Sequence, residues 1–158
     1  MKWGKWLENW DMTSLMVKAP FLEMEFKPQD EDKAAAWELY VELLTRITTQ
    51  SLVTSHGDEQ SALSSIHSLF ETTRVILKNN GRHCVEFTKI AILVLNQKIR
   101  PFTNKWHKLS IQGAFSDQSK CEEFREELES LQSTLQVYTQ MLADMAGVED
   151  LTELENVV

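Results

Sequence analysis

The segment from Glu86 to Ile111 constrains the fold of this chain more than any other. Its first half contains FTKIAILVLNQKI, which is apolar on nearly every side of a helix, and its second half, RPFTNKWHKL, is rich in basic and aromatic residues. A helix without a polar face belongs in the middle of a bundle, because every apolar face exposed to water costs free energy. Pro101 between the halves predicts a break or kink. We therefore expect an all-α protein with this segment at its centre.

The composition supports a single globular unit without a metal or a cofactor. A chain of 158 residues can bury a sizeable core, and five Gly and three Pro are too few for a turn-rich β fold. Cys84 and Cys121 form no disulfide framework and no metal-binding spacing, and the four His are scattered. No apolar run reaches the roughly 18 residues of a membrane-spanning helix. We expect reduced thiols and a cytoplasmic location.

Three further amphipathic helices are predicted around the apolar segment. The first covers residues 29–52, and the second begins near Asp58 or Ser61 and ends at the NNG sequence of residues 79–81. The third helix, from about Cys84 to Arg100, is the apolar segment itself, so its companions are the first, second and fourth helices. The inward stripe predicted for the first helix is Trp37, Tyr40, Val41, Leu44 and Ile47.

The fourth helix, over about 117–146, has the clearest periodicity. Its apolar residues are spaced alternately four and three apart over three heptads: Phe124, Leu128, Leu131, Leu135, Tyr138, Leu142 and Met145. Such a seam packs inside a four-helix bundle or forms a coiled-coil dimer, and three companion helices in the same chain favour the bundle. We predict an antiparallel four-helix bundle over residues 28–147, followed by an acidic tail over residues 148–158.

Residues 1–27 are predicted to form a separate Trp-rich helix and a β-ribbon. Trp3, Trp6 and Trp10 lie on one stripe of a short amphipathic helix, which either folds back onto the bundle or contacts a membrane surface or a partner protein. Residues 22–26 alternate between apolar and acidic side chains, the period of a half-buried strand, and residues 15–17 are its predicted hairpin partner.

The charge is unevenly distributed along the chain. The formal net charge of −8 argues against general binding of nucleic acid, yet residues 82–110 contain six Lys or Arg and a single acid, Glu86. Nucleic acid is therefore expected, if anywhere, only at residues 98–108. The side chains predicted to bind a partner are the three Trp of the N-terminal stripe together with Lys98, Arg100, Lys105, Trp106 and Lys108.

Arg100 and His107, separated by six residues in an all-α chain, resemble the R-x4-6-H motif of the HEPN ribonuclease family. The resemblance implies a dimeric four-helix bundle in which Arg100 steadies phosphate charge and His107 performs general acid–base chemistry on RNA. It covers eight residues, and Pro101 stands where the family usually has a polar residue.

Two longer stretches, WELYVELLTRITTQ and RPFTNKWHKLS, resemble uncharacterised bacterial helical proteins, for which a role in antiviral defence is one expectation. The sequence favours a non-enzymatic accessory subunit of a larger bacterial assembly, with a protein partner and with homo-oligomers as an alternative. The two other hypotheses are a HEPN-like ribonuclease using Arg100 and His107, and a peripheral membrane protein anchored by Trp3, Trp6 and Trp10.

Overall fold

The computed structural model describes residues 1–46 and 58–156, and this part of the chain is mostly helical. The all-α class predicted from the sequence is confirmed. The helices are α1 (Trp3–Asn9), α2 (Ala19–Leu22), α3 (Asp30–Leu44), α4 (Glu59–Asn80), α5 (Val85–Val94), the π-helical turn η1 (Leu95–Ile99), α6 (Arg100–Ile111), the 3₁₀ turn η2 (Ala114–Ser116), α7 (Gln118–Ala146) and the 3₁₀ turn η3 (Thr152–Asn156).

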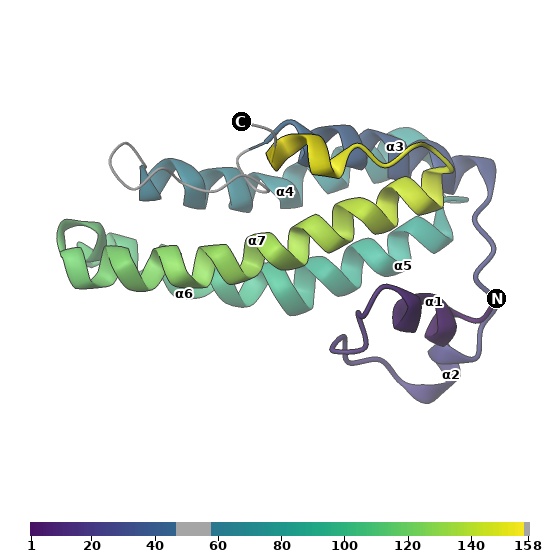
Figure 1. The fold of residues 1–158 in the computed structure, drawn as a ribbon, viewed down its shortest axis with the longest axis horizontal. Coiled ribbons are helices and arrows are strands. Elements are labelled where there is room, and N and C mark those ends of the chain that lie inside the picture. The colour runs from purple at the N-terminus through teal and green to yellow at the C-terminus, as the bar shows by residue number, and fades with distance from the viewer. Residues whose placement is uncertain (47–57, 157–158) are drawn as a thin grey trace.

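The long helices lie side by side as an elongated body. Helices α5 and α6, joined by η1, form one nearly continuous rod, and α7 returns alongside it (Figure 1). Helix α3 packs against α4, α5 and α7, while α4 also packs against α6. Helices α1 and α2 form a small lobe beside the end of the body where α5 begins and α7 ends (Figure 1). We call this lobe, residues 1–27, the N-terminal lobe.

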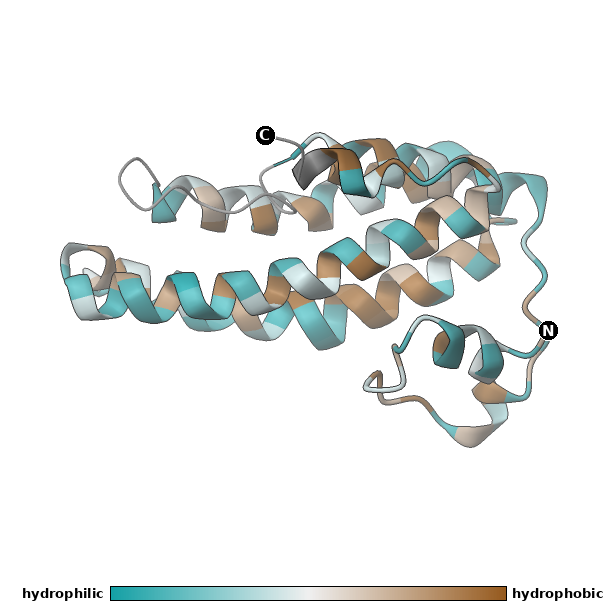
Figure 2. Ribbon diagram, viewed as in Figure 1, coloured by the Kyte–Doolittle hydropathy of each residue, from teal (hydrophilic) through white to brown (hydrophobic). Residues whose placement is uncertain are grey.

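The predicted seam of α7 forms the core of the body. All seven of its apolar side chains are buried, from Phe124 to Met145. Asp117 caps the helix by accepting a hydrogen bond from the backbone N–H of Ser119, and Gly147 ends it in the left-handed conformation. Figure 2 shows the resulting division, with hydrophilic residues along the outward side of the first half of α7.

Helix α5 is buried on one side rather than all round. Phe87, Ile90, Ala91 and Val94 are inaccessible to solvent, whereas Ile92 is 47% exposed. The apolar segment is thus central to the core, as predicted, but one of its faces reaches the surface.

The regular α-helix is interrupted by η1 directly before Pro101, but Pro101 itself does not end the helical rod. It lies in the first turn of α6, directly after η1, where the N–H of Arg100 donates to the carbonyl of Leu95. A π-helical turn accommodates one extra residue beside a proline, whose missing N–H and ring would disturb a regular α-helix. The rod therefore remains continuous through residue 101.

The predicted β-hairpin is wrong. Residues 19–22 form α2, with Pro20 in its first turn, and the only β pairing within residues 1–46 and 58–156 is one isolated bridge between Lys2 and Glu25. The backbone of residues 24–26 pairs with the start of the chain: the N–H of Trp3 donates to Met24, and that of Phe26 to Met1. The alternation in residues 22–26 therefore corresponds to a short backbone pairing with residues 1–3 and not to a two-stranded ribbon.

Helix α3 is rotated relative to the predicted stripe. Tyr40 is buried as expected, but Trp37 and Val41 are 48% and 37% exposed, and Ile47 lies outside the described residues. The buried face is instead Ala35, Ala36, Leu39, Tyr40 and Leu43. Small alanine side chains let α3 approach its neighbours closely, so the larger Trp37 is turned outward.

The segment after α7 is attached to α3. The hydroxyl of Tyr40 accepts a hydrogen bond of 2.9 Å from the N–H of Leu151 and donates to the carbonyl of Glu149. The side chain of Thr152 is buried. No helix among the described residues combines the length and apolar character that a membrane crossing requires.

Candidate functional site

The N-terminal tryptophans are placed inside the protein. The side chains of Trp3 and Trp6 are fully buried, and Trp10 is partly buried. The rings of Trp6 and Phe26 are stacked with centroids 4.0 Å apart, and Trp3 contacts Phe21 and Phe26 at about 5 Å. In this conformation Trp3 and Trp6 are covered and do not face a membrane or a partner.

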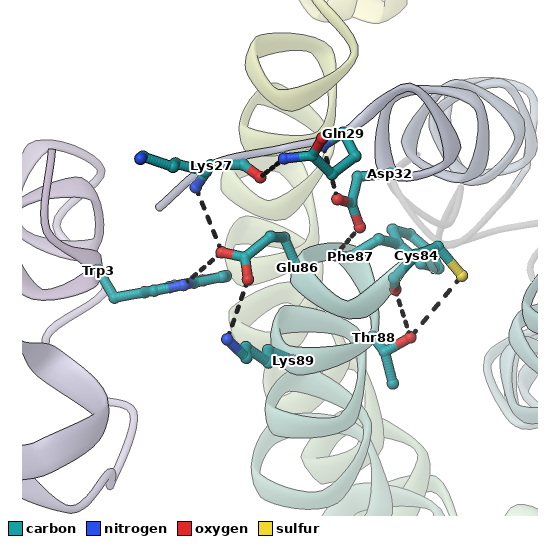
Figure 3. A network of polar contacts seen from close by, with 9 residues as sticks. All are labelled: Trp3, Lys27, Gln29, Asp32, Cys84, Glu86, Phe87, Thr88 and Lys89. Carbon is teal, nitrogen blue, oxygen red and sulfur yellow. Dashed lines mark hydrogen bonds and ion pairs between the residues drawn. The ribbon is translucent and has the colours of Figure 1, made fainter. Parts of the chain in front are cut away.

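Carboxylates of the helical body hold both indole N–H groups. Trp3 donates to Glu86 at 2.7 Å and Trp6 donates to Asp144 at 2.7 Å. Glu86 also accepts from the ammonium of Lys89 at 2.9 Å and from the backbone N–H of Lys27 (Figure 3). Hydrogen bonds to a charged acceptor contribute more than neutral ones. We call these contacts the indole–carboxylate junction.

Asp32 joins the start of α3 to the first turn of α5. Its fully buried carboxylate accepts from the backbone N–H of Gln29 at 2.8 Å and of Phe87 at 2.9 Å (Figure 3). It forms a capping box with Gln29 at the start of α3. Burial raises the pKa of Asp32, and the two backbone hydrogen bonds oppose that rise. Asp32 therefore has a structural role.

Most of the predicted basic corner is engaged within the protein. Lys98 donates to the hydroxyl of Ser14, and Lys105 forms ion pairs with Glu123 and Glu127, which raise the pKa of Lys105. Trp106 is fully buried against Phe115 and Phe124. Of the predicted partner-binding residues in this corner, Arg100 and Lys108 are exposed without an ion pair to a described residue.

Arg100 and His107 are both exposed and lie on one face of α6, two turns apart. The guanidinium of Arg100 lies 4.7 Å from the ring centre of Phe70 on α4, and its Nε donates to Asn96 at 3.1 Å. His107 lines a groove with His67 of α4. Sequence patterns did not predict a pairing of these histidines, because they lie far apart in the chain and only the packing of α4 on α6 brings them together.

An apolar groove runs between α3 and α4 on the surface of the body. Its volume is about 470 Å³, and its lining includes Trp37, Val41 and Val75, which are 48%, 37% and 44% exposed. The lining carboxylates are Glu38, Glu42 and Glu71, and none of the lining residues that the structure describes is Lys or Arg. We call this surface the α3–α4 groove. The sequence-based stripe missed it by turning Trp37 and Val41 inward.

Neither cysteine nor histidine forms a metal site in the part of the chain that the structure describes. Cys84 is buried and donates to the carbonyl of Gly81, and Cys121 is partly buried. No cluster of three or more His, Cys, Asp or Glu residues is arranged to hold a metal within residues 1–46 and 58–156.

Comparison with known proteins assigns the chain to no family. No protein-family model matches the chain, and neither the curated proteins nor the solved structures contain a significant match.

Proposed function

We propose that this protein is a non-enzymatic interaction subunit of a larger bacterial assembly, acting in the cytoplasm and built on an antiparallel four-helix bundle. The observation that carries the proposal is the α3–α4 groove. Three large apolar side chains, Trp37, Val41 and Val75, are exposed together there, although burying them would stabilise the fold. Contiguous apolar surface lined by polar residues is typical of protein-binding sites.

The partner that fits this groove is an amphipathic helix with an apolar stripe and basic flanks. A channel between two helices that pack side by side accepts the side chains of a third helix at i, i+3 and i+4 spacing. Glu42 and Glu71 of the rim pair with Arg46 and Arg74, while Glu38 accepts only a neutral hydrogen bond from Asn80. The rim therefore presents net negative charge, in a chain whose net charge is −8.

A synthetic helical peptide with a leucine stripe flanked by lysines tests the groove. We expect a labelled peptide of this kind to bind in fluorescence anisotropy, and a glutamate-flanked peptide not to bind. Val75→Arg places a cation in the apolar channel and should weaken binding about tenfold, equivalent to about 1.4 kcal/mol. Val85→Arg is the matched control, because Val85 is 49% exposed on α5, outside the groove lining.

The same variants test the function in the bacterium. A tagged wild-type chain and Val85→Arg should co-purify with a stoichiometric partner that Val75→Arg loses. Equal retention by both variants contradicts the proposed surface. Turnover of a substrate by the purified chain alone contradicts a non-enzymatic role.

A HEPN-like ribonuclease is the second candidate, favoured by the exposure of Arg100 and His107 on one face of α6. Under this alternative, His107→Ala abolishes RNA cleavage while the protein stays folded in circular dichroism, and the active species is a dimer. Cleavage that persists in His107→Ala removes this candidate.

A further inference from the structure

A second groove lies between α4 and α6, and its lining combines two imidazoles with amides and hydroxyls. Its volume is about 360 Å³. His67 on α4 and His107 on α6 contribute the imidazoles, and the polar groups between them come from Gln60, Ser64, Thr103 and Asn104. None of the described lining residues is acidic, although the chain carries 24 Asp and Glu residues. We call this surface the α4–α6 groove.

Positive charge lies at one end of the α4–α6 groove. The ring of His67 is 5.8 Å from that of Phe70, and the guanidinium of Arg100 lies 4.7 Å from the centre of the Phe70 ring. Arg46 also donates to the hydroxyl of Ser68 in the groove lining, but its charge is balanced by the ion pair with Glu42.

Of the acidic residues next to the groove that the structure describes, Asp58 caps α4 by accepting from the backbone N–H groups of Gln60 and Ser61, whereas Glu59 and Glu71 pair with cations. Glu59, which precedes the lining residue Gln60, pairs with Arg125 at 2.8 Å. Glu71, one turn after His67, pairs with Arg74. An anion in the groove therefore meets hydrogen-bond donors, with the Arg100 guanidinium nearby over Phe70 and no carboxylate among the described lining residues.

Phosphoryl oxygens match this set of groups. Imidazole, amide and hydroxyl groups all donate hydrogen bonds, and a phosphate offers several charged acceptor oxygens to satisfy them. A guanidinium beside them favours a dianionic or polymeric phosphate. We propose that the α4–α6 groove binds a phosphate-bearing ligand, with His67 and His107 of one chain donating to its oxygens and Arg100 supplying positive charge at the end of the groove.

This site involves neither the α3–α4 groove nor any cleavage step. It adds His67, which is absent from the Arg100–His107 motif, and it is complete within a single chain. Free phosphate and the phosphodiesters of single-stranded RNA share the chemistry, and two probes distinguish them.

The test follows the imidazole Cε1–H signals of the full chain by NMR during titration with inorganic phosphate and, separately, with a short oligouridylate. His67→Gln, His107→Gln and His83→Gln assign the signals. We expect His67 and His107 to shift together with one apparent Kd while His83, exposed in the turn between α4 and α5, stays fixed. His67→Ala should weaken binding about tenfold, the effect of losing a hydrogen bond to a charged group.

Each outcome decides the proposal. A paired shift with both probes and a lower apparent Kd for oligouridylate assigns the site to RNA phosphodiesters, whereas a shift with inorganic phosphate alone assigns it to a free phosphate. Chloride at matched ionic strength is the control. The proposal fails if neither signal moves, if His83 moves with them, or if His67→Ala binds as tightly as the control variant His83→Ala.

Discussion

Buried tryptophans at the two ends of the helical body differ in how their indole N–H groups are satisfied. At the N-terminal end, Trp3 and Trp6 donate to Glu86 and Asp144. At the opposite end, Trp106 is equally buried, but its Nε1 has no hydrogen-bond partner among the described residues. The first end is fixed by charge-assisted hydrogen bonds and the second by aromatic packing against Phe115 and Phe124.

This difference shows where the carboxylates of the body act. Near the N-terminal lobe, Glu86, Asp144 and Asp32 bind groups of the protein itself and hold residues 1–32 in place. Beside Trp106, the neighbouring His107 lines the α4–α6 groove, which has no carboxylate among its described lining residues. At the N-terminal end, carboxylates of the body accept hydrogen bonds from the N-terminal lobe. At the Trp106 end, the groove is lined by side chains that can donate hydrogen bonds, among them His107.

The largest effect is expected for Trp6→Ala. It removes a buried ring stacked on Phe26 and the donor to Asp144. Truncation of a buried Trp costs about 3–5 kcal/mol in the free energy of unfolding, which urea denaturation measures. Trp37→Ala is the matched control, because Trp37 is half-exposed. Similar losses for the two variants would mean that the N-terminal lobe does not pack on the body.

Replacing Trp by Phe separates hydrogen bonding from packing at the two ends. Trp3→Phe should cost about 1.5–3 kcal/mol, because a hydrogen bond to the charged Glu86 is lost. Trp106→Phe keeps an aromatic ring and removes an unpaired N–H, so its cost should be smaller by at least about 1 kcal/mol. Equal unfolding free energies for the two variants would erase the contrast between the ends.

Asp32→Asn tests the capping contact through its dependence on pH. Asn cannot accept both hydrogen bonds, so we expect a loss of about 1–3 kcal/mol near neutral pH. Burial raises the pKa of Asp32, so the folded state holds this proton more tightly than the unfolded state. The contribution of Asp32 to stability therefore falls as the pH rises from its ordinary pKa of about 3.9 to the raised value.

Denaturation of wild type and Asp32→Asn across this acidic range checks the sign. The stability difference between the two proteins should be largest below the ordinary pKa and decrease as Asp32 ionises. A difference that grows with rising pH in that range would show that the two backbone hydrogen bonds outweigh burial.

The smallest effect is expected for Lys105→Gln near Trp106. Lys105 and its partners Glu123 and Glu127 are each more than a third exposed, so solvent screens their attraction. We expect a loss below about 1 kcal/mol that disappears at high salt. A larger loss that survives in salt would show that ion pairing, and not only packing, holds this end.

A heptad pattern that continues through one helix made α7 predictable. The N-terminal lobe, in contrast, depends on contacts between residues that lie far apart in the chain. The seam from Phe124 to Met145 repeats over three heptads and is buried throughout. In contrast, residues 24–26 alternate like a strand but pair with residues 1–3 beside a Trp cluster. Similarly, the three alanines that precede Trp37 did not indicate that α3 would expose the Trp37 side chain.

The candidate sites were predictable only within one helix. The spacing of Arg100 and His107 placed them on one face of α6 before the fold was considered. His67 could not be added, because its position beside His107 depends on how α4 packs against α6. The α3–α4 groove was missed for a similar reason, since which face of an amphipathic helix is buried depends on its neighbours.

Hydrogen exchange of the five indole N–H groups, followed by NMR, tests most directly whether the N-terminal lobe is a fixed part of the protein. The indole–carboxylate junction predicts that the protons of Trp3 and Trp6 exchange as slowly as core amides, while that of the half-exposed Trp37 exchanges quickly. Fast exchange at Trp3 and Trp6, matching Trp37, would contradict a closed N-terminal end and return those rings to the surface.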